Sequence, residues 1–293
     1  MEQDAISTTD LTKHFGSAVA LESLDLQVRR GEVFGFLGPN GSGKTTTIRL
    51  LLGLIRPTRG SATIMGVPAE DVERAHRHVA SVPGDVTLWP QLTGRETLDL
   101  LGNVSGSVDV EFQAELIERL GVDPSKRLRS YSKGNRQKIA LVAAFMTRPD
   151  VLLLDEPTAG LDPLMEQQFQ ELARDASARG QTIFLSSHIL DEVQDLCDRV
   201  GILRAGRLVE VAALDDLRRL GSTVLQVVIE GPVPTFDGVS GVTSVEPIPG
   251  IAGGLRISVT GAPTAVLAWL ADASVVRLRT EEPSLEEIFL TYY

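Results

Sequence analysis

One short segment constrains this chain more than any other: a glycine-rich run between an apolar strand and a helix. Residues 38–45 read Gly-Pro-Asn-Gly-Ser-Gly-Lys-Thr and match G-x-x-x-x-G-K-[ST] at every specified position. The apolar run Val33–Leu37 precedes them, and helix-like sequence begins near Lys44. Glycines let consecutive backbone N–H groups converge on one phosphate, and the helix dipole adds to the attraction. An ordinary glycine-rich turn is the alternative, but this strand-and-helix context favours a phosphate-binding loop.

Two side chains at the end of this loop indicate which ligand the loop binds. The Lys44 ammonium can reach the β- and γ-oxygens of a nucleotide, and the Thr45 hydroxyl can ligate Mg²⁺. A second motif is the apolar run Val151–Leu154, which ends in Asp155 and Glu156. In a phosphate-loop protein, the first carboxylate holds Mg²⁺ through water and the second polarises the attacking water. A strand followed by Asp-Glu is common by itself, but together with the loop it predicts nucleotide hydrolysis.

A third polar position follows the apolar run Thr182–Leu185, in Leu-Ser-Ser-His-Ile. A lone histidine is usually structural. His188, however, comes at the carboxyl end of a third predicted parallel strand, and α/β folds place their ligands at that edge. We therefore predict that His188 contacts the γ-phosphate rather than serving only a structural role.

The order of segments predicts two unequal domains within 293 residues. Up to about residue 215, strands alternate with helical segments such as Arg136–Thr147, which indicates a mostly parallel sheet covered by helices. Residues 216–293 instead contain four β-rich segments, one helical stretch and turns rich in Gly and Pro, which predicts a small α+β domain. A final helix is expected in Pro283–Leu290, where Ser284 and Glu287 have capping-box spacing.

Composition limits the possible partners and the compartment. The net charge of −11 disfavours coating of nucleic acid or electrostatic docking on anionic lipid. The single cysteine, Cys197, cannot form an intramolecular disulfide, so we expect a buried structural thiol and a reducing, cytoplasmic environment. No apolar run approaches the roughly 18–20 residues that a membrane span needs.

With these motifs in this order, the chain resembles the nucleotide-binding subunit of an ABC transporter. That family carries a signature loop close to LSGGQ between its two nucleotide motifs. Here Tyr131–Asn135 reads Tyr-Ser-Lys-Gly-Asn: Ser132 and Gly134 fit the pattern, and the other three residues depart from it. The resemblance implies an α/β P-loop NTPase of the ABC type, with a RecA-like core and a helical subdomain at about 85–148, in an ATPase domain of residues 1–215.

The resemblance also implies how the site works. ATP and Mg²⁺ are the expected cofactors, with Thr45 and Asp155 at the metal, Glu156 as general base and His188 on the γ-phosphate. The signature loop closes on ATP held by a second copy of the chain, so a dimer with two sandwiched ATP molecules is expected. Phe15 would stack on adenine, and Asp162 belongs to a loop that couples the two sites. The residues expected to bind ATP are Phe15, Gly38, Pro39, Asn40, Gly41, Ser42, Gly43, Lys44, Thr45, Thr46, Ser132, Lys133, Gly134, Asn135 and Asp162.

One position departs from the family in a way that affects chemistry. A Gln that touches Mg²⁺ and the attacking water normally ends the strand Val79–Val82, and Gly84 stands in its place. Glycine has no side chain that could act as a ligand. Asp85, Gln91 or water substitutes for the Gln, or coupling works differently.

The tail carries a narrower resemblance. An extension of roughly 75 residues ending in Pro-Ser-Leu-Glu-Glu-Ile-Phe is similar to that of bacterial drug and antibiotic exporters of the daunorubicin type. This implies an ATPase subunit at the cytoplasmic face of the membrane. It would power efflux of drugs or other amphipathic compounds through a separate integral-membrane permease. The segment after Gly84, which includes Trp89–Glu96, would contact that permease. An ABC ATPase acting on ribosomes or nucleic acid is one alternative, disfavoured by the single phosphate loop and the acidic charge; an importer ATPase is another.

Overall fold

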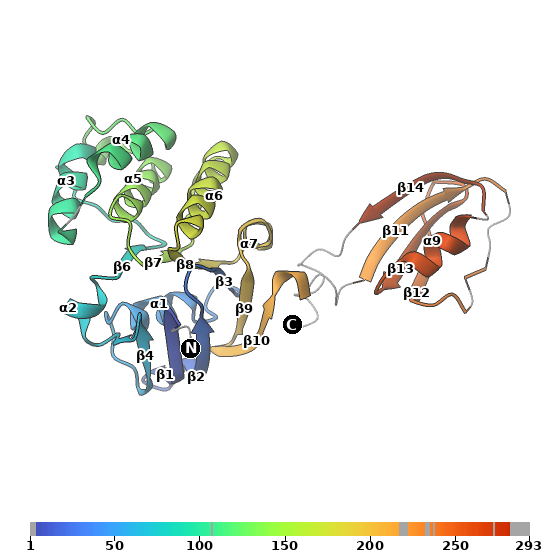
Figure 1. Cartoon of the computed structure of the whole chain (residues 1–293), viewed down its shortest axis with the longest axis horizontal. Helices are drawn as coiled ribbons and strands as arrows, with labels where there is room; N and C mark the ends of the chain where they lie inside the picture. The colour runs from blue at the N-terminus through green and yellow to red at the C-terminus, as the bar shows by residue number, and fades with distance from the viewer. Residues whose placement is uncertain are drawn as a thin grey trace. The chain divides into compact units, whose positions relative to one another are not determined.

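The computed structural model describes residues 4–106, 108–216, 222–231, 235–236, 238–271 and 273–281 (Figure 1). The chain divides into two compact units, Met1–Val211 and Ala212–Tyr293. The helix predicted for Pro283–Leu290 lies outside the described residues. Among the residues that are described, no helix is both long enough and apolar enough to cross a bilayer.

A six-stranded sheet forms the centre of the first unit. Its order is β10-β9-β3-β8-β7-β6, and β3 pairs in parallel with both β8 and β9, as β7 does with β6 and β8. Every residue of β3, β7 and β8 is buried, because a parallel sheet is covered on both faces. This confirms the predicted α/β class. The strands are β3 (Val33–Leu37), β6 (Val79–Val82), β7 (Val151–Asp155), β8 (Thr182–Ser187), β9 (Arg199–Arg204) and β10 (Arg207–Ala213).

Helices α3, α4 and α5 lie together in a separate layer of this unit, where α5 contacts both of the others (Figure 1). The prediction that a helix begins at Arg136 is wrong by three residues. α5 begins at Lys133 because the Ser132 hydroxyl caps it, accepting a hydrogen bond from the Asn135 N–H at 3.2 Å. The helices are α1 (Lys44–Leu51), α2 (Val72–Ala75), α3 (Gly94–Ser105), α4 (Val110–Arg119), a 3₁₀ turn (Leu128–Ser130), α5 (Lys133–Phe145), α6 (Pro163–Ala178) and α7 (Leu190–Leu196).

A second, antiparallel sheet was not anticipated from the sequence. Its order is β2-β1-β4-β5, with β1 (Ile6–Phe15), β2 (Ala18–Val28), β4 (Arg59–Ile64) and β5 (Val67–Pro68). In β2, apolar residues alternate with polar ones from Leu24 to Val28, since one face packs inward and the other meets solvent. The inward side chains join the core that contains Phe34 and Phe36 of β3. The sheet therefore packs beside the strand that leads into the glycine-rich loop.

The second unit is a four-stranded antiparallel sheet with one helix. The sheet order is β12-β13-β11-β14, and alternate residues of β11 and β13 are buried beneath Val266 and Leu270 of α9. This is the α+β composition predicted from the β-rich segments and the single helical stretch. The elements are β11 (Ser222–Ile229), β12 (Val242–Pro247), β13 (Gly254–Thr260), α9 (Thr264–Ala271) and β14 (Val275–Glu281).

Candidate functional site

The glycine-rich loop connects β3 to α1 at the carboxyl edge of the parallel sheet. Gly43 stands at the start of α1 with φ of 114°, a conformation that L side chains rarely adopt. An added Cβ there would also lie 2.6 Å from the Ala20 carbonyl oxygen, so only glycine fits. No side chain caps the helix start. The first N–H groups of α1 are therefore available to an anion, which is the geometry that the predicted phosphate loop requires.

Two polar side chains inside the loop support the same function. Lys44 is 5% exposed, and its Nζ donates to the carbonyl oxygens of Gly38 at 2.6 Å and Pro39 at 3.2 Å. Burial lowers the pKa of Lys44, and the carboxylates of Glu156 and Asp155 oppose that shift. The Ser42 Oγ is buried and has no hydrogen-bond partner within the described part of the chain. A buried cation beside an unsatisfied hydroxyl suits phosphate oxygens.

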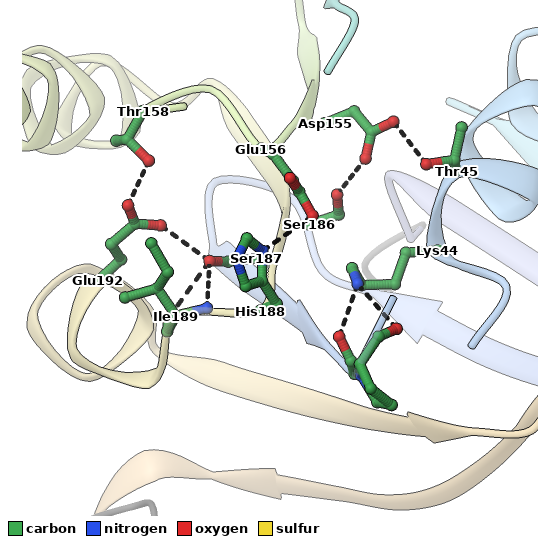
Figure 2. A network of polar contacts seen from close by, with 12 residues as sticks. Lys44, Thr45, Asp155, Glu156, Thr158, Ser186, Ser187, His188, Ile189 and Glu192 are labelled. Carbon is green, nitrogen blue, oxygen red and sulfur yellow. Dashed lines mark hydrogen bonds and ion pairs between the residues drawn. The ribbon is translucent and has the colours of Figure 1, made fainter. Parts of the chain in front are cut away.

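Asp155 is held by hydroxyl groups on both of its oxygens (Figure 2). Thr45 Oγ1 donates to Asp155 Oδ2 at 2.8 Å, and Ser186 Oγ donates to Asp155 Oδ1 at 2.5 Å. The Thr45 hydroxyl and the Asp155 carboxylate are hard oxygen donors at one point, which fits Mg²⁺. No group of three His, Cys, Asp or Glu side chains arranged to hold a metal occurs among the described residues. Phosphate oxygens and water would therefore have to complete the coordination of Mg²⁺.

Glu156 and His188 meet across neighbouring strand ends. The Glu156 Oε1 lies 2.9 Å from the His188 Nδ1 (Figure 2). Glu156 has φ of 47°, in the left-handed region, and its N–H donates to the Ser186 carbonyl at 3.0 Å. A non-glycine residue in that region costs about 1–2 kcal/mol, and such strain is often found at functional sites. The turn after β7 thus directs the Glu156 side chain toward His188. We refer to Lys44, Thr45, Asp155, Glu156, Ser186 and His188 as the strand-end cluster.

A cavity of about 560 Å³ opens beside this cluster. A Cβ added to Gly84 would lie 3.4 Å from the Asp155 carbonyl oxygen and 3.5 Å from its Oδ2. Position 84 is therefore within reach of the carboxylate that suits the metal, and glycine leaves that space open. Asp85 lines the same cavity. Its wall also includes Asn40, Thr45, Ser81, Asp155 and Glu156.

Phe15 is the last residue of β1, and it is exposed to solvent. Its side chain is 51% exposed, and the Lys13 Nζ lies 4.9 Å from the ring centroid. The hairpin of β1 and β2 runs on to Ala20, whose carbonyl oxygen lies against Gly43. The position suits an aromatic platform beside the phosphate loop.

The signature residues form a second contact cluster. The N-terminus of α5 lies so close to the loop Pro157–Gly160 that a Cβ at Gly134 would be 2.4 Å from the Gly160 carbonyl oxygen. Gln137 Nε2 donates to the Pro157 carbonyl at 2.8 Å. Asp162 caps α6, where its Oδ1 accepts from the Met165 N–H at 3.1 Å. The Ser132–Asn135 turn therefore lies beside the loop that follows Glu156.

Sequence reasoning missed four polar residues, one within the strand-end cluster and three behind it. Ser186 bonds to Asp155, while Thr158 and Ser187 both donate to the buried carboxyl group of Glu192 on α7 (Figure 2). Two signals were available: consecutive serines at the end of a buried strand, and a Glu four residues before Leu196, on the apolar face of a short helix. Cys197 is buried, as expected, and burial raises the pKa of its thiol.

Comparison with known proteins agrees with this geometry. Residues 21–159 match the family model described as ABC transporter. The linearmycin resistance ATP-binding protein of Bacillus subtilis is 30% identical over 301 residues, which covers 97% of both chains. The chain belongs to the family of ABC transporter ATP-binding subunits. The resemblance drawn from the sequence is confirmed, and with it ATP binding and the ATPase activity of the family.

Other relatives of this ATP-binding subunit include two further proteins named for antibiotics. The bacitracin transport ATP-binding protein of Bacillus licheniformis is 38% identical over 228 residues, covering 75% of this chain and 74% of the relative. The daunorubicin/doxorubicin resistance ATP-binding protein of Streptomyces peucetius is 37% identical over 230 residues, covering 76% and 70%.

Solved structures agree on the fold of the subunit. An ATP-binding subunit of an ABC transporter is 34% identical with a TM-score of 0.69, over 73% of this chain and 92% of that one. A dimeric ATP-binding cassette in a post-hydrolysis state with ADP and Pi has a TM-score of 0.65 over 71% and 98%. At 23% identity, the second likeness concerns the fold alone.

Proposed function

We propose that this subunit powers the export of antibiotics or similar amphipathic compounds through a separate membrane permease, from the cytoplasmic face of the membrane. The observation that carries the proposal is the likeness to the linearmycin resistance protein, which extends over 97% of both chains and so includes the second unit. The relatives named for bacitracin transport and for daunorubicin/doxorubicin resistance support the same class of cargo.

In the proposed site, the glycine-rich loop and Lys44 bind the phosphates of ATP, and Phe15 stacks on adenine. Thr45 and Asp155 would hold Mg²⁺, which would supply positive charge to the phosphate oxygens. Glu156 accepts a proton from the attacking water, and His188 holds the γ-phosphate and orients Glu156 through their 2.9 Å contact. Ser186 keeps Asp155 turned toward Thr45.

The proposed active form is a dimer with two sandwiched ATP molecules. Ser132–Asn135 of one copy would close on the nucleotide held by the other, because the positive end of the α5 helix dipole and its first N–H groups attract an anion. The dimeric cassette with a similar fold supports this arrangement. Asp162 would set the spacing of the two sites through the start of α6.

The permease is proposed to dock near the cavity beside Gly84. Asp85 and Leu54 line that cavity, and the side chains of Leu54 and Trp89 are 64% and 49% exposed. The docking proposal therefore rests on Leu54 in the cavity wall and on Trp89 in the segment that follows Gly84. The segment 85–96 would then pass the movement of the helical layer to the membrane partner.

An efflux assay tests the proposal. The gene for the subunit is deleted, and the strain is complemented with the wild-type subunit or with Glu156→Gln. We expect accumulation of a fluorescent amphipathic antibiotic to rise several-fold in the deletion strain. Only the wild-type subunit should reverse it, because efflux requires turnover.

The same strains separate the alternatives. Loss of uptake that depends on a substrate-binding protein would indicate an importer. Association of the purified subunit with ribosomes, together with unchanged drug accumulation, would contradict the proposal in favour of a non-transport ATPase.

A further inference from the structure

Glu192 lies in the first turn of α7 and is 9% exposed, yet both of its carboxyl oxygens are used. Thr158 Oγ1 donates to Oε1, and Ser187 Oγ donates to Oε2 at 2.8 Å (Figure 2). These two hydroxyl groups come from different segments: Thr158 lies in the loop after β7, and Ser187 is the last residue of β8. A buried carboxyl group bonded on both sides connects the elements that it bridges.

Each of the two bridged residues is close in sequence to a residue with a proposed catalytic role. Thr158 is two residues after Glu156, and Ser187 immediately precedes His188. The Ser187 Oγ also accepts from the Ile189 N–H at 2.9 Å, so the hydroxyl closes a tight turn around His188. The 2.9 Å contact between His188 and Glu156 joins the same two segments a second time. The two segments are therefore connected on one side through Glu192 and on the other through His188 and Glu156.

We infer that Glu192 is a positioning residue that keeps Glu156 and His188 facing each other. The inference rests on the roles proposed above for those two side chains. Glu192 contacts neither of the reacting groups; it acts by holding the backbone of both segments in one arrangement. A misplacement of about 1 Å at a reacting group can cost on the order of 10² in rate.

The charge around Glu192 indicates which variant preserves the bridge. Burial raises the pKa of Glu192, and Glu166 on α6 adds to this shift; the hydrogen bonds from Thr158 and Ser187 and the nearby His188 act against it. At the end of α7, the Cys197 thiol also lies within electrostatic range of Glu192. A neutral amide is therefore compatible with the site.

A glutamine can reproduce both hydrogen bonds. Its carbonyl oxygen can accept from Thr158, and its Nε2 can donate to the Ser187 Oγ. The Ser187 hydroxyl hydrogen would then turn to the Ile189 carbonyl, which already lies 3.3 Å away. Alanine can form neither bond. Comparison of Glu192→Gln with Glu192→Ala thus separates the effect of the two hydrogen bonds from the effect of the negative charge.

The test uses the full chain with Glu192→Ala, Glu192→Gln and, as a control on the same helix, the exposed Asp195→Ala. We expect Glu192→Ala to lower kcat for ATP about 10- to 100-fold while KM changes less than about 3-fold. Glu192→Gln should restore kcat to within about 3-fold of the wild type, and Asp195→Ala should leave it unchanged.

A second measurement reports the position of His188 directly. The chain has four histidines, so the His188 ring signals can be assigned by NMR with His188→Ala. Glu192→Ala should shift those signals, whereas Glu192→Gln should leave them near the wild-type positions. Should Glu192→Ala fail to fold, Thr158→Val removes one of the two bonds at similar volume and should give an intermediate loss of kcat.

Three results would overturn the inference: wild-type kcat in Glu192→Ala and Thr158→Val, an equal loss in Glu192→Gln and Glu192→Ala, or unmoved His188 signals. Normal hydrolysis by Glu156→Gln would instead refute the proposed catalytic roles. The two failures are therefore distinguishable.

Discussion

The strand-end cluster and the Ser132–Asn135 turn serve one proposed reaction but are built by different means. In the strand-end cluster, charged and hydroxyl side chains bond to one another: Thr45 and Ser186 to Asp155, and His188 to Glu156. In the turn, backbone geometry dominates, because Ser132 caps α5 and Gly134 allows the Gly160 carbonyl to approach. Activity should therefore be lost in the strand-end cluster when a functional group is removed. In the Ser132–Asn135 turn, it should be lost when an added side chain prevents the close approach of the backbone.

The largest effect should come from Glu156→Gln in the strand-end cluster. The amide keeps the shape of the side chain but cannot accept the proton of the attacking water. We expect turnover to fall about 10²- to 10⁴-fold with ATP binding retained, so that an ATP-bound dimer accumulates. Steady-state ATPase assays and light scattering after gel filtration measure both effects. The exposed Glu118→Gln on α4 is the control, and normal hydrolysis by Glu156→Gln would refute its role as general base.

A smaller effect is expected from Gly134→Ala in the signature turn. The new Cβ would meet a backbone oxygen at 2.4 Å, so α5 and the loop Pro157–Gly160 must move apart. We expect turnover to fall about 10- to 100-fold, because the proposed contact to the second ATP is displaced. Binding of a fluorescent ATP analogue to one copy should change little, since the strand-end cluster is intact.

The partly buried Lys138→Ala on the same helix serves as the control for that variant. If Gly134→Ala loses nucleotide binding in proportion to turnover, the two clusters do not act separately, and the contrast between them fails.

The smallest effect is expected from Gly84→Gln. A side chain at this position would enter the space beside the Asp155 carboxylate, which glycine leaves open in a cavity of about 560 Å³. Because the cavity has room for it, we expect the ATPase rate to change only about 2- to 5-fold in either direction. Complete loss of activity would show that the site depends on an open position 84.

The sequence by itself determined the site's local pieces. The glycine-rich loop and the strand ending in Asp155 and Glu156 are contiguous patterns, and each carries its chemistry within a few residues. The alternation of strands and helices predicted the α/β class, and the family resemblance, carried by the order of the motifs, indicated the ATP-binding subunit.

Only the tertiary structure decided which of these pieces meet. β7 and β8 pair in a register that places Asp155 beside Ser186, and a shift of one residue would turn the side chains to the opposite face. That register also brings Glu156 to His188 across 32 residues of sequence. The bridge from Glu192 to Thr158 and Ser187, and the antiparallel sheet of β1, β2, β4 and β5, likewise depend on long-range contacts, which no local pattern encodes.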